Sequence, residues 1–284
     1  MPTVNINGLR IHVESAGEGE PVVLVHGSWG DHLNWDPLVA EIPEGFRVIR
    51  YDRRGHSRSE RPPGQGNVGE DVADLAAIVE TVARGPAHVV GNSFGASIAL
   101  RLAASRPELL RSLAVHEPPL WELAPDEPGV RSLDDAVRPV LRRLAAGDWE
   151  GGARTFAEAI VFGPGAWDAG MPDRLKATFL ANAPTFLDES RDPEAYGIDT
   201  ARLAAFTEPT LLSAGDRSAP GFHAVIERLA AALPHAERAM MAEAGHVPYA
   251  THPAEYAALL TSFWARSAGR RRSRGAGAAS VGAA

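Results

Sequence analysis

Short continuous apolar runs alternate with longer amphipathic stretches along the chain. Residues 21–26, Pro-Val-Val-Leu-Val-His, are typical of a strand with both faces buried. Similar runs predict further strands over 46–51, 87–91, 110–117, 209–214 and 237–241. Asn7-Gly8 predicts a tight hairpin turn within residues 4–14. Helical spacing predicts helices over 69–83, 94–105, 222–233 and 253–266. This alternation predicts an α/β fold with a mostly parallel, doubly wound sheet.

The alternation stops between residues 118 and 207. That stretch contains helical patterns over 132–146, 151–161 and 172–180, and no convincing strand. It is too long to be a loop in a compact domain. We therefore predict a core formed by residues 1–117 and 208–268, with residues 118–207 inserted as a helical cap.

The C-terminal end differs in composition from the rest of the chain. Five arginines and no acidic residue lie within 266–284, which ends in Ala, Gly, Ser and Val. This bias predicts a disordered, solubilising tail over 269–284. The whole chain has a net charge of −8. Without the five arginines of this segment, the rest of the chain has a net charge of −8 − 5 = −13. Such an acidic body argues against a nucleic-acid partner.

The composition and motif spacing of the chain exclude several classes of functional site. The 284 residues include no cysteine, which excludes disulfides, a thiolate nucleophile and a cysteine-ligated metal. No spacing of His, Asp or Glu is typical of a metal site. Gly64 to Gly69 fits G-x-G-x-x-G but follows Arg-Pro-Pro instead of a strand, so we interpret it as a surface loop. No membrane-length apolar run or secretion signal is visible, and we expect a cytoplasmic protein without a membrane partner or cofactor.

The strongest chemical signal is Gly91-Asn-Ser-Phe-Gly95. It matches G-x-S-x-G and lies directly between a predicted buried strand and a predicted helix. A serine on such a sharp turn projects from the carboxyl edge of the sheet, and the flanking glycines leave room for it. The pattern predicts that Ser93 is a nucleophile and that the Phe94 N–H helps to stabilise an oxyanion.

A second signal, His26-Gly-Ser-Trp-Gly30, follows the first buried strand. This loop can supply a second N–H to the oxyanion hole, and we predict Ser28 as its donor, with Trp29 as the neighbouring alternative. We expect His26 to be a structural hydrogen-bonding residue.

A third signal is His246, which follows Gly245 after the last predicted strand. A serine nucleophile needs a base, and neutral imidazole is the usual one. The chain order of serine, acid and histidine places the base last, which favours His246 among ten histidines.

Together with residues 51–59, Tyr-Asp-Arg-Arg-Gly-His-Ser-Arg-Ser, these motifs resemble the α/β-hydrolase fold superfamily. The resemblance covers roughly residues 4–265. It implies a Ser–His–acid triad and identifies the insertion as the family's cap.

The resemblance leaves two candidates for the acid. Most members have an aspartate three residues after the glycine that ends the strand before the penultimate helix. Here that glycine is Gly215, position 218 is serine, and Asp216 comes two residues early. Another branch, which includes several dehalogenases and the zearalenone-type lactone hydrolases, has the acid one strand earlier, where this chain has Glu117. We predict Glu117, with Asp216 as the alternative.

The sequence thus predicts a serine hydrolase that cleaves an ester or lactone of an apolar small molecule. C–C bond hydrolysis and cofactor-free perhydrolysis use the same residues and stay open, as does a non-catalytic ligand receptor on the same scaffold. The oligomeric state also stays open. Aromatic residues near the site predict an apolar pocket wall; those chosen are Trp29, Trp121, Phe162 and Trp167.

Overall fold

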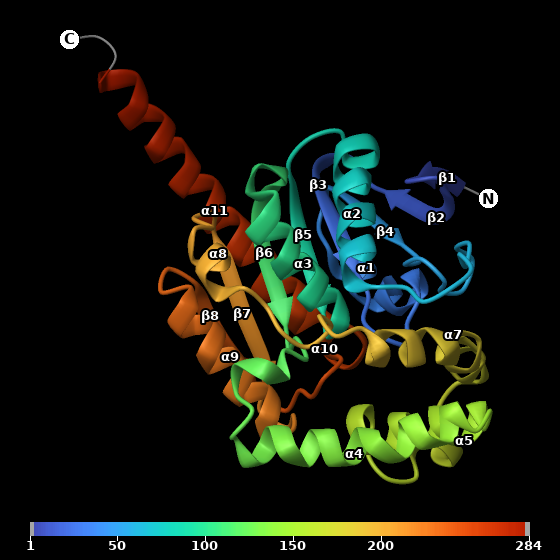
Figure 1. Ribbon diagram of the computed structural model, residues 1–284. Helices are drawn as coiled ribbons and strands as arrows, with labels where there is room; N and C mark the ends of the chain where they lie inside the picture. Colours follow the sequence, from blue (N-terminus) through green and yellow to red (C-terminus); the bar gives the residue numbers. More distant parts are fainter. Residues whose placement is uncertain (1–2, 282–284) are drawn as a thin grey trace.

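A twisted eight-stranded sheet runs through the centre of the molecule in the computed structural model, which describes residues 3–281 and the side-chain surroundings of residues 3–268 (Figure 1). The strands are β1 (Thr3–Ile6), β2 (Leu9–Ala16), β3 (Gly19–Val25), β4 (Gly45–Tyr51), β5 (Ala87–Asn92), β6 (Leu110–His116), β7 (Thr210–Gly215) and β8 (Glu237–Met241). Their spatial order is β1-β2-β4-β3-β5-β6-β7-β8. The β1–β2 and β2–β4 pairs are antiparallel and the other neighbours are parallel, which confirms the predicted fold class.

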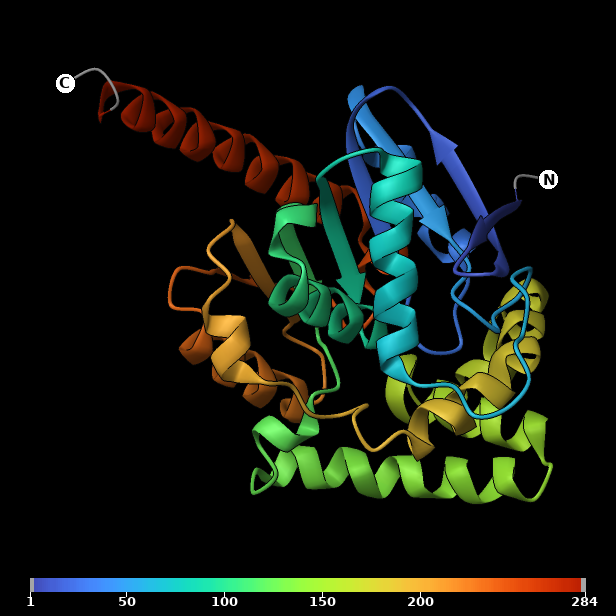
Figure 2. The ribbon, with the colours of Figure 1, turned by 45° about the horizontal axis from the view of Figure 1, so that its top comes forward.

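Helices cover both faces of this sheet (Figures 1 and 2). The α-helices of the described residues are α1 (Asp36–Glu41), α2 (Val68–Ile78), α3 (Phe94–Ser105), α4 (Pro128–Ala145), α5 (Trp149–Phe156), α6 (Ala166–Ala169), α7 (Asp173–Arg191), α8 (Thr200–Ala204), α9 (Pro220–Ala232), α10 (Pro248–Thr251) and α11 (Pro253–Val281). The short helices α1, α6, α8 and α10 were not predicted from the sequence.

The continuous apolar run of β3 follows from this double coverage. Val23 and Val25 belong to the hydrophobic cluster under α2, α3 and α9. Val22 and Leu24 belong to the cluster under α1 and α11. Because successive strand residues point to opposite faces, a strand buried on both sides needs apolar residues at every position.

The interruption between β6 and β7 consists of helices in the described structure, and α4, α5 and α7 lie beyond the carboxyl ends of the central strands (Figure 1). These helices share a hydrophobic cluster of their own. The ends of the insertion behave differently, since Leu120 and Leu203 belong to the cluster of the sheet. The insertion therefore covers the sheet edge at which the candidate residues were expected.

Two helices extend further than the sequence predicted. Helix α7 continues through Pro184 to Arg191, although the pattern indicated an end near residue 180. Proline removes one helical hydrogen bond, but Phe179, Ala183 and Phe186 bury one face of α7 on the cap core. Tertiary packing thus outweighs the local propensity.

Helix α11 continues to Val281, so the backbone of residues 269–281 is helical where a disordered tail was predicted. Alanine and arginine are good helix formers, and they extend a helix already anchored by Leu260 and Phe263. The side-chain surroundings of residues 269–284 lie outside the described residues. Among the helices that are described, none is both long and apolar enough to cross a membrane.

Candidate active site

Ser93 occupies a sharp turn between β5 and α3. Its backbone has φ 54° and ψ −125°, a conformation that strains a residue with a side chain. The flanking glycines are required by close packing: a Cβ on Gly95 would come within 2.2 Å of the Val25 carbonyl oxygen, and one on Gly91 within 2.5 Å of the Gly95 carbonyl oxygen. The local sequence therefore forces the serine into the projecting position that the motif predicted.

The oxyanion-loop candidate lies beside this turn because β3 and β5 are neighbours in the sheet, with Val25 opposite Gly91. A Cβ on Gly27 would lie 2.8 Å from the Ser93 Cβ. Phe94 is the first residue of α3, where an N–H has no acceptor inside the helix. The loops that carry Ser28 and Phe94 thus meet at Ser93, as their proposed role requires.

His26 is a structural residue, as expected. Its Nε2 accepts a hydrogen bond from the Arg53 N–H at 3.0 Å, and its Nδ1 lies 2.8 Å from the Gly27 carbonyl oxygen. Burial, together with the charge of Arg53, lowers the pKa of His26 to about 3. A neutral imidazole in this position fixes the loop between β3 and η1 (His32–Trp35) to the loop after β4.

The structure brings His246 and Glu117 together from loops after β8 and β6. His246 Nδ1 lies 2.7 Å from Glu117 Oε2, and both side chains are buried. The Phe222 ring stacks on the imidazole with centroids 4.4 Å apart. The Asn92 amide donates to the His246 carbonyl oxygen at 2.9 Å. These contacts fix the ring plane and leave Nε2 as the nitrogen available for proton transfer.

Glu117 is held as a carboxylate in this environment. Its Oε1 accepts the Gly215 N–H at 2.8 Å, and its backbone has the positive φ of 48°. Burial acts to raise the pKa of Glu117, but the neighbouring His116 and the hydrogen bond with His246 outweigh it and lower the pKa to about 2. The side chain therefore stays ionised at neutral pH beside the imidazole.

Asp216, the alternative acid, is exposed. Its backbone N–H donates to the Met241 carbonyl oxygen at 3.0 Å. Within the described residues, no hydrogen bond or ion pair joins its carboxylate to His246. Of the two candidate acids, Glu117 is therefore the one that contacts the His246 ring in the described structure.

A cavity of about 130 Å³ lies beside Ser93 and His246. Ser93, His246 and Ser28 all line it, so the nucleophile and base candidates face the same space. The remaining wall is mostly apolar; it consists of Leu33, Pro37, Phe156, Val161, Phe162, Leu175, Phe179, Val247, Tyr249 and Ala250, with Asn34, Asn92, Arg174 and Gly27 among them. An apolar cleft with a few convergent polar groups is typical of a small-molecule site.

Only one of the four predicted wall aromatics lines this cavity. Phe162 does, and its side chain is 37% exposed. Trp121 packs on Phe222, and Trp167 is buried inside the cap. Trp29 is fully buried and stacks on Phe156, with ring centroids 5.0 Å apart. The expectation was wrong for these three tryptophans because the insertion needs large apolar residues for its own core and its anchorage.

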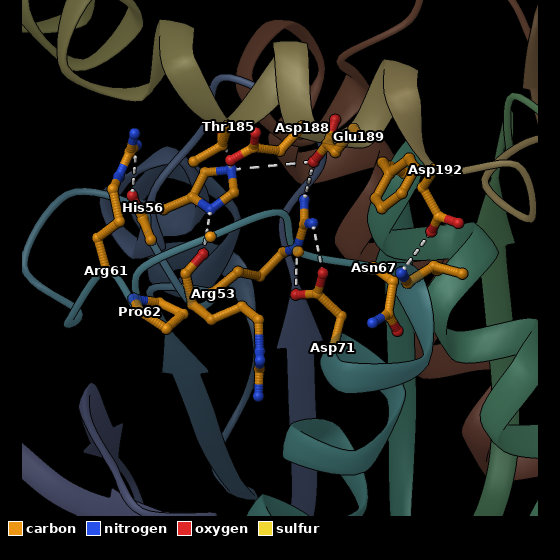
Figure 3. A pocket seen from close by; sticks show the side chains of 16 residues that line it. Arg53, His56, Arg61, Pro62, Asn67, Asp71, Thr185, Asp188, Glu189 and Asp192 are labelled. Atoms are coloured by element: carbon orange, nitrogen blue, oxygen red, sulfur yellow. Dashed lines mark hydrogen bonds and ion pairs between the residues drawn. The ribbon is translucent and has the colours of Figure 1, made fainter.

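A buried charge network that the sequence analysis missed joins Glu189 of the cap to Arg53 and Asp71 (Figure 3). It reaches the oxyanion-loop candidate through Ser28. Glu189, on cap helix α7, accepts a hydrogen bond from Ser28 Oγ at 2.5 Å and one from Arg53 Nη1 at 2.8 Å. Arg53 also donates two hydrogen bonds of 3.0 Å to Asp71, and its guanidinium lies 4.8 Å from the Phe94 ring centre. The network therefore touches both residues expected to supply the oxyanion hole.

The positive charge of Arg53 and the carboxylates of Asp71 and Glu189 stabilise one another. Burial opposes the charge of Arg53, but the carboxylates of Asp71 and Glu189 hold its pKa above the usual value. Burial raises the pKa of Glu189, while Arg53 and Ser28 act in the opposite direction. Removing one partner would leave the others buried with an unmatched charge or donor.

Glu189→Gln should therefore destabilise the protein by about 1–3 kcal/mol, the cost of an unsatisfied buried partner. Chemical denaturation monitored by tryptophan fluorescence would measure it. Glu150→Gln, an exposed change on α5, is the matched control and should alter stability by less than about 0.5 kcal/mol. Equal stability of the two variants would show that the Glu189 contacts do not hold the cap.

Comparisons with known proteins agree with this fold. The model of a family described as "Alpha/beta hydrolase family" matches residues 22–259. The putative carbamate hydrolase RutD of Variovorax paradoxus is 31% identical over 271 residues, which covers 91% of this chain and 96% of that protein.

Two solved structures are similar over nearly the whole chain. An α/β hydrolase from Sphaerobacter thermophilus has 30% identity and a TM-score of 0.74, covering 93% of this chain and 100% of the other. Est816, described as an N-acyl homoserine lactone degrading enzyme, has 26% identity and a TM-score of 0.75, covering 92% and 100%. With the family model matched across both halves of the sheet domain and the cap, this chain belongs to the alpha/beta hydrolase family and is a hydrolase.

Proposed function

We propose that this protein is a serine hydrolase that cleaves an ester or lactone of an apolar small molecule through an acyl-enzyme. One observation carries the proposal: strained Ser93 and His246, which is hydrogen-bonded to Glu117 at 2.7 Å, line the same cavity. A serine, an imidazole and a carboxylate in this chain order form the arrangement that activates a hydroxyl for acyl transfer.

In the proposed mechanism, His246 Nε2 takes the proton from Ser93 Oγ as that oxygen attacks the substrate carbonyl carbon. Glu117 accepts the hydrogen bond of His246 Nδ1–H, which fixes the tautomer and stabilises the imidazolium. His246 then protonates the leaving alcohol. Water attacks the acyl-enzyme in the second half of the reaction, with His246 again as base, and Ser93 is regenerated.

The oxyanion would be stabilised by the N–H groups of Phe94 and Ser28. Phe94 contributes the free N–H at the start of α3, where the helix dipole adds positive potential. Support for Ser28 comes from its place in the cavity wall and from the hydrogen bond of its side chain to Glu189, which restricts the loop.

The cavity wall supports the substrate class. Apart from the polar groups near Ser93, most wall residues are apolar, and a volume of about 130 Å³ fits a small acyl group. The names of the relatives also support hydrolysis of carbonyl compounds, since one is a putative carbamate hydrolase and another degrades a lactone.

A substrate panel of nitrophenyl esters, lactones and acyl-thioesters tests this proposal. We expect turnover of short apolar esters or lactones and little turnover of esters with charged acyl groups. Phe162→Ala should lower kcat/KM for the preferred substrate about tenfold, because roughly 1.4 kcal/mol of apolar contact is lost. Trp149→Ala, an equally exposed cap change outside the cavity wall, should leave it unchanged.

Two results would contradict the proposal. A preference for charged, hydrophilic acyl groups would contradict the substrate class. Tight binding of these compounds without turnover would favour a ligand receptor on the hydrolase scaffold instead.

A further inference from the structure

A second cluster of chemically active side chains lies at the β2 end of the sheet. His12 and Glu14 are two residues apart on β2, so both point to the same face. His32 begins η1, the 3-10 turn His32–Trp35. Glu14 Oε1 lies 3.2 Å from His12 Nε2 and 3.3 Å from His32 Nε2, and these three atoms lie within 4.8 Å of one another. Both histidines are buried, and Glu14 is half-buried.

The orientation of His32 is fixed from its other side. Its Nδ1 lies 2.6 Å from Asp52 Oδ1, which also accepts the His32 backbone N–H at 2.8 Å. Because a carboxylate oxygen is an acceptor, this contact places a proton on His32 Nδ1, which donates a hydrogen bond to Asp52. This arrangement, with a carboxylate behind a histidine, is the usual support of a metal-ligating imidazole.

The consequence is an uncompensated lone pair. With the proton on Nδ1, His32 Nε2 is an acceptor, and it faces the carboxylate of Glu14. It is buried and has no hydrogen-bond partner in the described part of the chain, since its contact with Glu14 lacks hydrogen-bond geometry. In this tautomer two acceptors face each other 3.3 Å apart, an unfavourable contact that a bound cation or a second proton on the ring relieves.

The spacing of Glu14 Oε1 from each of the two imidazole nitrogens suits a transition-metal ion. Ligands bound at about 2.0–2.1 Å in tetrahedral geometry are separated by about 3.3 Å. The two distances to Glu14 Oε1 match that value. The other oxygen of Glu14 is occupied by Arg50 Nη2 at 2.9 Å, which leaves Oε1 to face the imidazoles.

The guanidinium of Arg58 is a cation beside the same atoms, so it would compete with a metal ion for them. Its Nη1 lies 3.4 Å from His12 Nε2 and 3.7 Å from Glu14 Oε1. Its side chain is 47% exposed, so it can leave the cluster for solvent at small cost.

We propose that His12 Nε2, His32 Nε2 and Glu14 Oε1 bind one divalent transition-metal ion of the zinc class, with Arg58 as the cation that the ion displaces. Two imidazoles and one carboxylate are borderline ligands that suit zinc better than calcium or magnesium. The ion would join β2 to the segment between β3 and α1, which also carries Ser28. The site does not depend on the proposed hydrolytic chemistry.

Titration calorimetry of the full chain, stripped with chelator and titrated with Zn²⁺ or Mg²⁺, tests the proposal. We expect one Zn²⁺ per chain, no comparable binding of Mg²⁺, and a higher melting temperature with Zn²⁺. His32→Ala and Glu14→Gln should each weaken Zn²⁺ affinity by on the order of 100-fold. Co²⁺ bound to the parent protein should give the intense visible absorption of a tetrahedral site.

Two further variants keep the test decisive if His32→Ala does not fold. Arg58→Ala, a half-exposed change, should tighten Zn²⁺ binding because the competing charge is removed. His235→Ala removes an exposed histidine outside the cluster and should leave the affinity unchanged. Absence of Zn²⁺ binding, equal losses in His235→Ala and the cluster variants, or weaker binding in Arg58→Ala would each overturn the proposal.

Discussion

Replacing Ser93 by alanine should lower kcat for the preferred ester by on the order of 10⁶-fold, as loss of an activated serine does in other triads. The hydroxyl is the only nucleophile candidate on the strained turn, and without it His246 has no proton to accept. A residual rate of about 10³–10⁴ over the reaction in water should survive, because substrate binding and the oxyanion hole stay intact.

Steady-state hydrolysis of a nitrophenyl ester measures this loss, and thermal unfolding shows whether the variant is folded. Ser105→Ala, at the other end of α3, is the matched control and should keep the parent rate. Hydrolysis by Ser93→Ala at close to the parent rate would exclude the acyl-enzyme mechanism.

Glu117→Gln should lower kcat by on the order of 10⁴-fold. Both carboxylate oxygens of Glu117 accept hydrogen bonds, one from Gly215 N–H at 2.8 Å and one at His246 Nδ1 at 2.7 Å. Glutamine has a single acceptor oxygen, so its NH₂ group must face one of these donors. With the NH₂ group toward His246, the imidazole is held in the wrong tautomer; with it toward Gly215, the tautomer survives, but the buried Gly215 contact and the negative charge that stabilises the imidazolium are lost.

Asp216→Asn is the matched comparison, because it also removes one charge at the end of a neighbouring strand. Its exposed carboxylate is not joined to His246 among the described contacts, so we expect less than about a threefold change in kcat. A large loss of kcat in Asp216→Asn, together with nearly unchanged kcat in Glu117→Gln, would reverse the assignment of the acid.

The elements around Ser93 were predictable because local and global requirements coincide there. A strand buried on both faces must be apolar throughout, which made β5 recognisable in the sequence. The strained turn at Ser93 needs glycines beside it, which made residues 91–95 recognisable as well. The position of Glu117 could be inferred because the carboxyl ends of parallel strands meet at one edge.

The cap was less predictable because its structure depends on contacts between distant segments. Nothing in the spacing around Trp29 shows that its ring enters the core of the cap, against Phe156 and Phe186. Helix α7 likewise passes through Pro184 because its buried face is stabilised by those aromatics.

Charged residues gave the weakest signal. In the sequence, Asp71 and Asp74 look like ordinary acidic residues near the start of a helix, but Asp71 holds buried Arg53 and Asp74 holds Arg54. The His12–Glu14–His32 cluster escaped notice because β2 and the turn after β3 contribute its members. A spacing rule detects ligands on one element only, whereas the fold brings these two segments together.

Labelling with a fluorophosphonate, followed by peptide mapping in a mass spectrometer, tests the central claim most directly. The reagent forms a covalent adduct only with a serine that an adjacent base activates. We expect one adduct per chain, on Ser93, and none in Ser93→Ala or after prior incubation with a slowly hydrolysed ester. An unlabelled parent protein, or an adduct on another residue, would contradict the assignment of Ser93 as the activated nucleophile.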